Sequence, residues 1–165
     1  MLITGYHGTT ETYALKILAD ESFYISCSNK EWLGNGIYFY EKFSDAYAWR
    51  PASGEKKVVL HSVVSIDDNG YIDIDSPTGE KVWMEILDYI CKVAHIKLTG
   101  TAQENQCAIC RMIWDSDDNI MVLAASFATT RTRVQSLIDK RTRRREFCVR
   151  NNEPIKCTQI INYEG

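Results

Sequence analysis

The sequence predicts an α+β domain in which strands at both ends of the chain surround a helical middle. The first ten residues indicate a strand, and residues 145–162 indicate two more strands joined by the polar turn NNEP. Between them, residues 77–99 carry apolar side chains every three or four positions, which is typical of an amphipathic helix. This arrangement favours an α+β domain over alternating βαβ units. At 165 residues the chain fits one domain, over residues 1–165, whose core needs neither disulfides nor metal.

Two strand and helix pairs are predicted in the first third of the chain. Apolar and β-branched patterning predicts strands at 2–10 and 36–40 and short helices at 11–20 and 44–51. Gly34 and Gly36 predict a turn ahead of the aromatic strand GIYFY. Ser44 is a candidate N-cap for the second helix, because its hydroxyl can accept a bond from a free backbone N–H.

The rest of the chain contains the clearest helix. We expect strands at 56–67 and 70–75, helices at 77–99 and 104–118, a strand or helix at 119–130, and two final strands within 144–162. Ser76 has the chemistry of an N-cap, and Pro77 suits the first helical position. Gly100 is the predicted end of that helix, because glycine is common just after a helix C-terminus.

Composition and charge restrict the function classes. The chain is 45% hydrophobic and 25% charged, and no apolar run approaches the roughly 18 residues that a bilayer span needs. The N-terminus has no basic segment leading into an apolar stretch, so we expect a cytoplasmic protein with reduced cysteines and no membrane partner. Residues 131–165 are strongly basic although the net charge is −3, which predicts a phosphate-binding face on an acidic body.

Three fragments stand out together: YHGT at 6–9, LGNGIYF at 33–39 and REFCVR at 145–150. Their order and character resemble the poly-ADP-ribose-polymerase-like branch of the ADP-ribosyltransferases. That pattern has a histidine in a first strand, a tyrosine in a G-x-G-I-Y-F strand and a glutamate at the start of a late apolar strand. These positions match His7, Tyr38 and Glu146. The resemblance implies an ADP-ribosyltransferase-like split β-sheet core with flanking helices.

The resemblance also implies NAD as co-substrate. Cleavage of the bond between nicotinamide and ribose passes through an oxocarbenium-like sugar, as glycoside hydrolysis does. Nicotinamide leaves as a neutral molecule, so one carboxylate suffices. By the resemblance, Glu146 bonds the 2′-hydroxyl of the reacting ribose and stabilises its developing charge. His7 orients the adenosine-side ribose, and the backbone of Gly8, with Thr9 in the same fragment, contacts NAD.

The nicotinamide ring is expected to lie between two aromatic side chains. Tyr38 is the first, and counting along the family pattern places the second on Trp49. The serine that many relatives use to hold the carboxamide falls on Ala46, with Ser44 two residues earlier. Either Ser44 substitutes for it or that hydrogen bond is missing.

The residues ahead of Glu146 indicate the acceptor. Arginine-specific relatives carry a carboxylate two positions before the glutamate, where this chain has Arg144. With Arg143 and Arg145, this cation would repel an arginine substrate and attract a phosphodiester backbone. We therefore expect mono-ADP-ribosylation of single-stranded RNA or DNA. The resemblance to small bacterial and phage-defence toxins also implies a neutralising antitoxin partner.

Other interpretations remain open. With the same fold, the acceptor could be a protein side chain, water, as in an NAD glycohydrolase, or the phosphate of a spliced RNA, as in an RNA 2′-phosphotransferase. A non-catalytic nucleic-acid-binding module would need only the arginine-rich segment. Glu153 is the competing carboxylate in the last turn. A further set of residues has the chemistry of zinc ligands but also fits apolar helix faces, so we expect no metal: Cys91, His95, Cys107 and Cys110.

Overall fold

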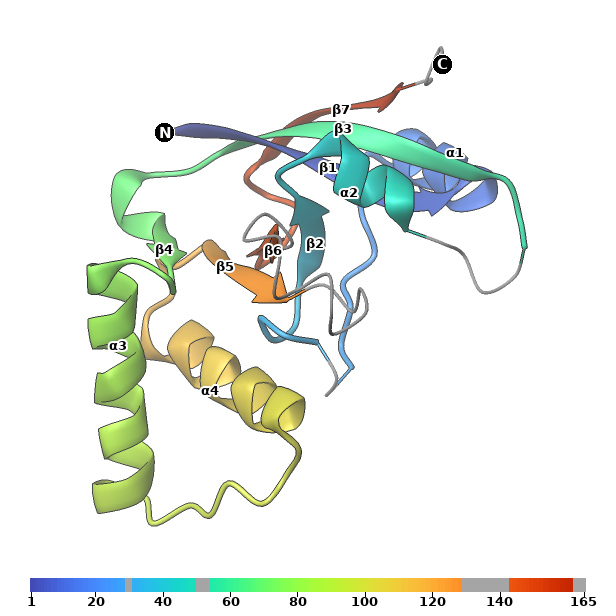
Figure 1. The fold of residues 1–165 in the computed structure, drawn as a ribbon. Helices are drawn as coiled ribbons and strands as arrows, with labels where there is room; N and C mark the ends of the chain where they lie inside the picture. The colour runs from blue at the N-terminus through green and yellow to red at the C-terminus, as the bar shows by residue number, and fades with distance from the viewer. Residues whose placement is uncertain (29–30, 50–53, 129–142, 162–165) are drawn as a thin grey trace.

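The computed structural model describes residues 1–28, 31–49, 54–128 and 143–161. In order along the chain, these ranges contain β1 (Leu2–Thr10), α1 (Glu11–Asp20), β2 (Ile37–Tyr40), α2 (Phe43–Ala48), β3 (Lys57–Ser65), β4 (Tyr71–Asp73), α3 (Pro77–Asp88), α4 (Ala102–Ser116), β5 (Val122–Ala128), β6 (Arg143–Val149) and β7 (Ile155–Ile161). The strands form one seven-stranded sheet in the order β4-β5-β6-β2-β1-β3-β7 (Figure 1). The predicted α+β class is confirmed.

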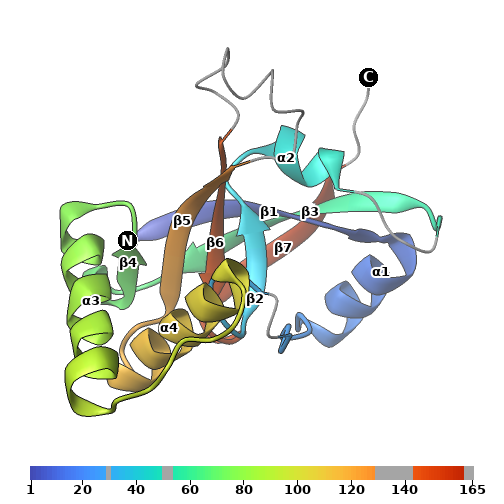
Figure 2. The same ribbon diagram turned by 60° about the horizontal axis from the view of Figure 1, so that its bottom comes forward.

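The sheet consists of two parts that meet between β1 and β2. On one side β1 pairs with β3 over its whole length, from Leu2↔Ser65 to Thr10↔Lys57, and β7 extends that part. On the other side β2, β6, β5 and β4 pair in turn. β1 and β2 are paired at Tyr6↔Tyr40, and in Figure 2 the strands of the two parts cross steeply. The pairing between neighbouring strands is therefore shortest between β1 and β2.

Each face of the sheet is covered by a separate apolar cluster. Side chains alternate along a strand, so Phe39 and Phe147 point to one face while Tyr38 and Cys148 point to the other. The first cluster includes residues of α1, such as Ala14 and Ile17, together with Phe23 and the two phenylalanines. The second consists of residues from α4, β5, β6, the turn before β2, the turn after α3 and the loop before β5, and partly buried residues of α3 pack against it. Its buried members are Leu33, Ile90, Ile109, Cys110, Ile113, Trp114, Ile120, Leu123, Ala125 and Cys148.

Several predicted helix boundaries are confirmed and others were wrong. Ser76 caps α3 by accepting a hydrogen bond from the Gly79 amide at 3.0 Å, as its position predicted. The helix ends earlier than Gly100, because a π-helical turn at Tyr89–Val93 follows α3 and His95 then adopts a left-handed φ of 51°. Ser44 is not an N-cap: α2 begins at Phe43, and its N-cap is Lys42, which makes no side-chain capping bond.

The two C-terminal strands are present as predicted, but they do not pair with each other. β6 pairs with β2 and β5 in one part of the sheet, whereas β7 pairs with β3 in the other. The polar turn NNEP therefore carries the chain between the two parts. The ambiguous stretch at 119–130 contains the strand β5. Within the described residues, no helix has both the length and the apolar composition that crossing a bilayer requires.

The close packing of α3 against β4 gives a first prediction. A Cβ atom at Gly79 would lie 1.9 Å from the carbonyl oxygen of Asp73, so any side chain would push α3 away from β4. Glycine to alanine in a helix ordinarily stabilises by about 1 kcal/mol. We expect Gly79→Ala instead to lower the free energy of unfolding by about 2 kcal/mol in urea titration. Thr78→Ala, at an exposed neighbour, is the control, and a stabilised Gly79→Ala would contradict this packing.

Candidate functional site

His7 lies where β1 and β2 separate. Its Nδ1 is 2.8 Å from the carbonyl oxygen of Tyr38, beyond the paired residues of the two strands. Its ring packs edge-on against Phe23 and Phe39, at centroid distances of 5.3 and 5.9 Å. A carbonyl only accepts hydrogen bonds, so Nδ1 carries the proton. Burial lowers the pKa of His7, which keeps the imidazole neutral and leaves Nε2 as a hydrogen-bond acceptor.

A pocket of about 600 Å³ opens beside His7. It lies between β1, α1 and the chain that follows α1, and its lining combines apolar and hydroxyl side chains: His7, Thr9, Tyr13, Ile17, Tyr24, Ile25 and Ser26. Tyr13 and Tyr24 are exposed and meet edge-on at 5.9 Å. The pocket therefore offers aromatic surface at its rim and hydroxyl and imidazole groups within, a combination that suits a nucleoside.

Gly8 is needed for packing between β1 and α2. A Cβ atom there would lie 2.6 Å from the carbonyl oxygen of Ala46 and 3.0 Å from Cβ of Trp49. This contact explains the glycine without a ligand, and a carboxamide contact of its backbone stays a prediction. Ala46 is fully buried in the same contact, whereas Ser44 is exposed. Because residues two apart on a helix do not share a face, Ser44 does not take the place of a serine at position 46.

Tyr38 is fixed through its hydroxyl group. The hydroxyl donates to the carbonyl oxygen of Gly34 at 2.6 Å and accepts from the amide of Leu33 at 2.9 Å. Burial raises the pKa of the phenol, with a further contribution from the Cys148 thiol, so the hydroxyl stays protonated. The polar end of Tyr38 is thus occupied by the protein's own backbone, which holds the ring in one orientation.

Glu146 points to the same face of the sheet as Tyr38. It is paired with Tyr40 on β2 and with Ala125 on β5, and Tyr38 lies two residues from Tyr40 along its strand. Burial raises the pKa of Glu146 to about 7, opposed by the neighbouring Arg144 and assisted by the carboxylates of Glu31 and Asp45. A carboxyl group that titrates near neutral pH in a partly buried position is typical of a functional residue.

A short segment over this face, residues 31–36, is held by side chains from α4 and the sheet. Each of four consecutive carbonyl oxygens accepts a side-chain hydrogen bond: Trp32 from Cys110, Leu33 from Trp114, Gly34 from Tyr38 and Asn35 from Cys148. Arg111 adds two bonds to the Asn35 side chain, at 2.8 and 3.2 Å. Gly34 has a left-handed φ of 81°, which favours glycine. The 31–36 segment is therefore fixed relative to Tyr38 and Glu146.

Glu31, at the start of this segment, is the site residue that sequence reasoning missed. Its carboxylate accepts a hydrogen bond from the hydroxyl of Ser26, which lines the His7 pocket. Its negative charge contributes to the raised pKa of both Tyr38 and Glu146. In the sequence it stands alone in a polar loop, and the bond to Ser26 five residues earlier has no motif that would have revealed it.

Arg145 is engaged in an ion-pair cluster. Its guanidinium contacts the carboxylates of Glu41 at 2.6 Å, Asp73 at 2.6 Å and Asp75 at 3.2 Å. These carboxylates occupy its donors, so Arg145 is a structural residue rather than the predicted acceptor contact. Arg144 lies 3.9 Å from Asp45 and beside Glu146, and Arg143 is exposed at the start of β6. The other basic residues that precede Glu146 fall within 131–141, which lies outside the described residues.

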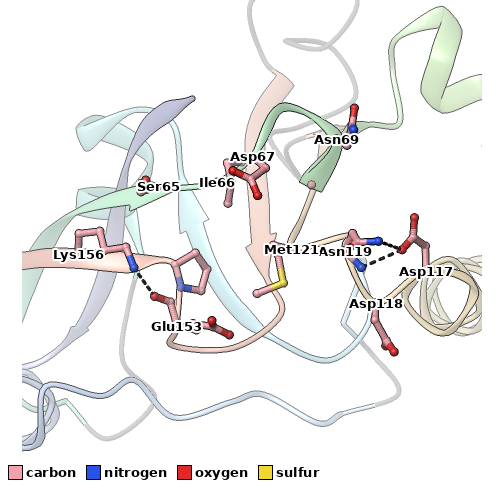
Figure 3. Close-up of a pocket in the computed structure, with 12 residues that line it drawn as sticks. Ser65, Ile66, Asp67, Asn69, Asp117, Asp118, Asn119, Met121, Glu153 and Lys156 are labelled. Carbon is pink, nitrogen blue, oxygen red and sulfur yellow. Dashed lines mark hydrogen bonds between the residues drawn. The ribbon is translucent and has the colours of Figure 1, made fainter.

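A second cavity, of about 790 Å³, lies at another part of the molecule (Figure 3). Asp117 accepts two bonds from Asn119 at 2.8 Å, and Lys156 donates to the backbone of Glu153 at 2.8 Å. The polar groups at its edge thus bond to one another. The predicted site residues are not among its lining residues, although Glu153, the competing carboxylate, is. We therefore place the candidate site at His7, Tyr38 and Glu146.

The cysteines do not have the arrangement of a metal centre. In the described parts of the chain, no three His, Cys, Asp or Glu side chains are placed to hold a metal ion. Cys107 and Cys110 are buried on α4, and their thiols donate to the backbone of Ser28 and Trp32. Cys91 is exposed. All six cysteines are unpaired in the structure.

Comparison with known proteins includes a short match to an uncharacterized protein of Methanocaldococcus jannaschii. The two are 43% identical over 47 residues, which cover 28% of this chain and 22% of the archaeal protein. The match thus spans about a fifth of that relative's length. No family model and no solved structure matches the chain. The function must therefore be inferred from the chain's own side chains.

Tyr38 provides a test of the 31–36 segment. Tyr38→Phe keeps the ring but leaves the Leu33 amide and the Gly34 carbonyl without their partner. We expect the free energy of unfolding to fall by about 1–3 kcal/mol, measured by urea titration. Tyr24→Phe, at an exposed tyrosine, should change it little. Equal stability of Tyr38→Phe and the wild type would mean that the hydroxyl does not hold the segment.

Glu146 should make stability depend on pH. The folded-state pKa is raised from 4.5 to about 7, so the folded protein binds this proton more tightly than the unfolded chain. The resulting stabilisation is complete below pH 4.5 and is lost as pH rises through 7. Glutamine does not titrate, so Glu146→Gln should gain stability relative to the wild type between about pH 5 and 8, by on the order of 2 kcal/mol. Glu153→Gln should show no such trend.

Proposed function

We propose that this protein is an NAD-dependent mono-ADP-ribosyltransferase with His7, Tyr38 and Glu146 at its active site. The observation that carries the proposal is their arrangement on three neighbouring strands, β1, β2 and β6, where the two parts of the sheet meet. His7 is bonded directly to the backbone of Tyr38, and Tyr38 shares a sheet face with Glu146. That the sheet has two parts supports the proposal, because the sequence resemblance implied a split β-sheet core.

The His7 pocket suits the adenosine half of NAD. The neutral imidazole, with Nδ1 bonded to the protein, has Nε2 available to accept a ribose hydroxyl. Tyr13 and Tyr24 provide flat surface for a purine at the rim. The predicted contact of Thr9 agrees with its place in the pocket lining.

The chemistry belongs to the face that carries Glu146. As the ribose loses nicotinamide it becomes electron-poor, and a carboxylate bonded to its 2′-hydroxyl stabilises that charge. This requires the ionised form of Glu146, whose pKa is about 7. Tyr38, held by the 31–36 segment, would stack on the nicotinamide, and Trp49 beside Gly8 is the proposed second aromatic partner.

For the acceptor we propose single-stranded RNA or DNA, approached from the Arg143 end of β6. Arg145 does not support this proposal, because its guanidinium is ion-paired with three carboxylates. Support comes from the exposed Arg143, from Arg144 beside Glu146, and from the basic sequence that precedes them. An enzyme that consumed NAD and modified nucleic acid would act as a toxin or an anti-phage effector in the cytoplasm, and a neutralising partner is part of the proposal.

NAD consumption by the purified protein tests the reaction. We expect nicotinamide release with kcat/KM rising with pH through a midpoint near 7, because Glu146 must lose its proton. Glu146→Gln should lower kcat at least about a hundredfold at pH 8 while NAD binding persists. Glu153→Gln is the matched control and should retain full activity. Wild-type turnover that survived in Glu146→Gln would contradict the assigned role.

The acceptor is tested with NAD labelled in its ADP-ribose part. Purified protein is incubated separately with single-stranded RNA, single-stranded DNA, cell protein and buffer alone. Label in a nucleic acid supports the proposed acceptor, and label confined to protein refutes it. Nicotinamide release with no labelled macromolecule would identify water as the acceptor and the protein as a glycohydrolase.

A further inference from the structure

The face of β5, β6 and β2 that carries Glu146 is covered by the 31–36 segment. Trp32 packs its ring on Phe127 of β5 at 5.4 Å, and Phe127 is paired with Arg144, two residues from Glu146. In its middle, at Leu33 and Gly34, the segment bonds to the hydroxyl of Tyr38. Glu31 directly precedes Trp32, so its backbone adjoins the part of the segment that packs on the Glu146 face of the sheet.

The carboxylate of Glu31 is held in a defined place. Ser26 donates its hydroxyl to Glu31, and the backbone of Ser26 is bonded to that of Gly36 at 2.9 and 3.0 Å. Ser26 also lines the His7 pocket. Glu31 thus contacts a residue of the pocket proposed for adenosine, and it adjoins Trp32, which packs on the sheet face of the carboxylate proposed for the chemistry.

We propose that Glu31 is the second carboxylate of the candidate site, a positioning residue whose negative charge acts through Glu146. This inference rests on the proposed function for its catalytic consequence. A second negative charge in the same site makes the ionised Glu146 a stronger hydrogen-bond acceptor for a ribose hydroxyl. They also make the site favourable for a cationic nicotinamide ring and sugar before a neutral product leaves.

The other groups around Glu146 do not duplicate this role. Arg144, two residues earlier on β6, favours its ionised form, and Tyr40 faces it from β2 as a neutral phenol whose pKa burial raises. Asp45 on α2 contributes a like charge but lies 3.9 Å from Arg144, which offsets it. Glu31 is hydrogen-bonded to a neutral hydroxyl. Its charge is therefore the one to test.

The first experiment measures the coupling without catalysis. The titration of Glu146 is obtained as the difference in unfolding free energy between the wild type and Glu146→Gln across pH, and again in a Glu31→Gln background. Glutamine still accepts the Ser26 hydroxyl, so the fold should persist. We expect the midpoint to fall by about one pH unit when Glu31 is replaced. Glu85→Gln, an exposed carboxylate on α3, is the control and should leave it unchanged.

The second experiment uses NAD consumption. In Glu31→Gln we expect the midpoint of the kcat profile to move to lower pH, with kcat several-fold lower above pH 8 and KM for NAD nearly unchanged. A merely structural role would lower kcat at all pH values without moving the midpoint. An unmoved midpoint in the unfolding or the kcat profile overturns the inference.

The two proposals can fail separately. If the wild type consumes no NAD but the unfolding midpoint shifts, the proposed function fails and the carboxylate pair stands. If Glu31→Gln does not fold, carboxyl NMR titration of the wild type decides: the Glu31 carboxyl signal must show an inflection at the titration midpoint of Glu146. A Glu31 signal without that inflection overturns the pair.

Discussion

The hydrogen bonding of the 31–36 segment is the constraint on which the candidate site depends. Four consecutive carbonyl oxygens of this segment accept hydrogen bonds from a tyrosine, an indole and two thiols. Without these side chains the oxygens would lose those donors. Those donors come from α4, β2 and β6, so the segment joins elements that are distant in the chain. These bonds fix the orientation of Tyr38 and the position of Glu31. They also hold the segment over the sheet face that carries Glu146.

The separation of β1 from β2 determines where His7 lies in the candidate site. A fully paired sheet would present one continuous surface at this point, with the backbone groups of both strands bonded to each other. Here the strands part after Tyr6 and Tyr40, and His7 reaches the Tyr38 carbonyl instead. The imidazole therefore lies between the pocket beside α1 and the backbone of β2. The side chains of Tyr38 and Glu146 lie on the face of the sheet opposite Phe39, against which the imidazole packs.

The sequence predicts the positions of the strands better than it predicts which strands pair with each other. Local patterning is enough to place β1, α1, α4 and the start of α3, because periodicity and capping residues act within a few positions. It does not reveal that β6 and β7 enter different parts of the sheet, since the turn between them suits a hairpin equally well. His7, Tyr38 and Glu146 carry a recognisable motif, whereas Glu31 and the three carboxylates around Arg145 become neighbours only through tertiary structure.

The pairing of β2 with β6 has a consequence for how the protein is made. Tyr40 and Glu146 face each other across about 100 residues of chain, so the ribosome must synthesise all of that chain before the two strands can pair. Until then the nascent polypeptide carries His7 and Tyr38 but lacks Glu146. The three residues of the candidate site can therefore come together only after β6 has left the ribosome.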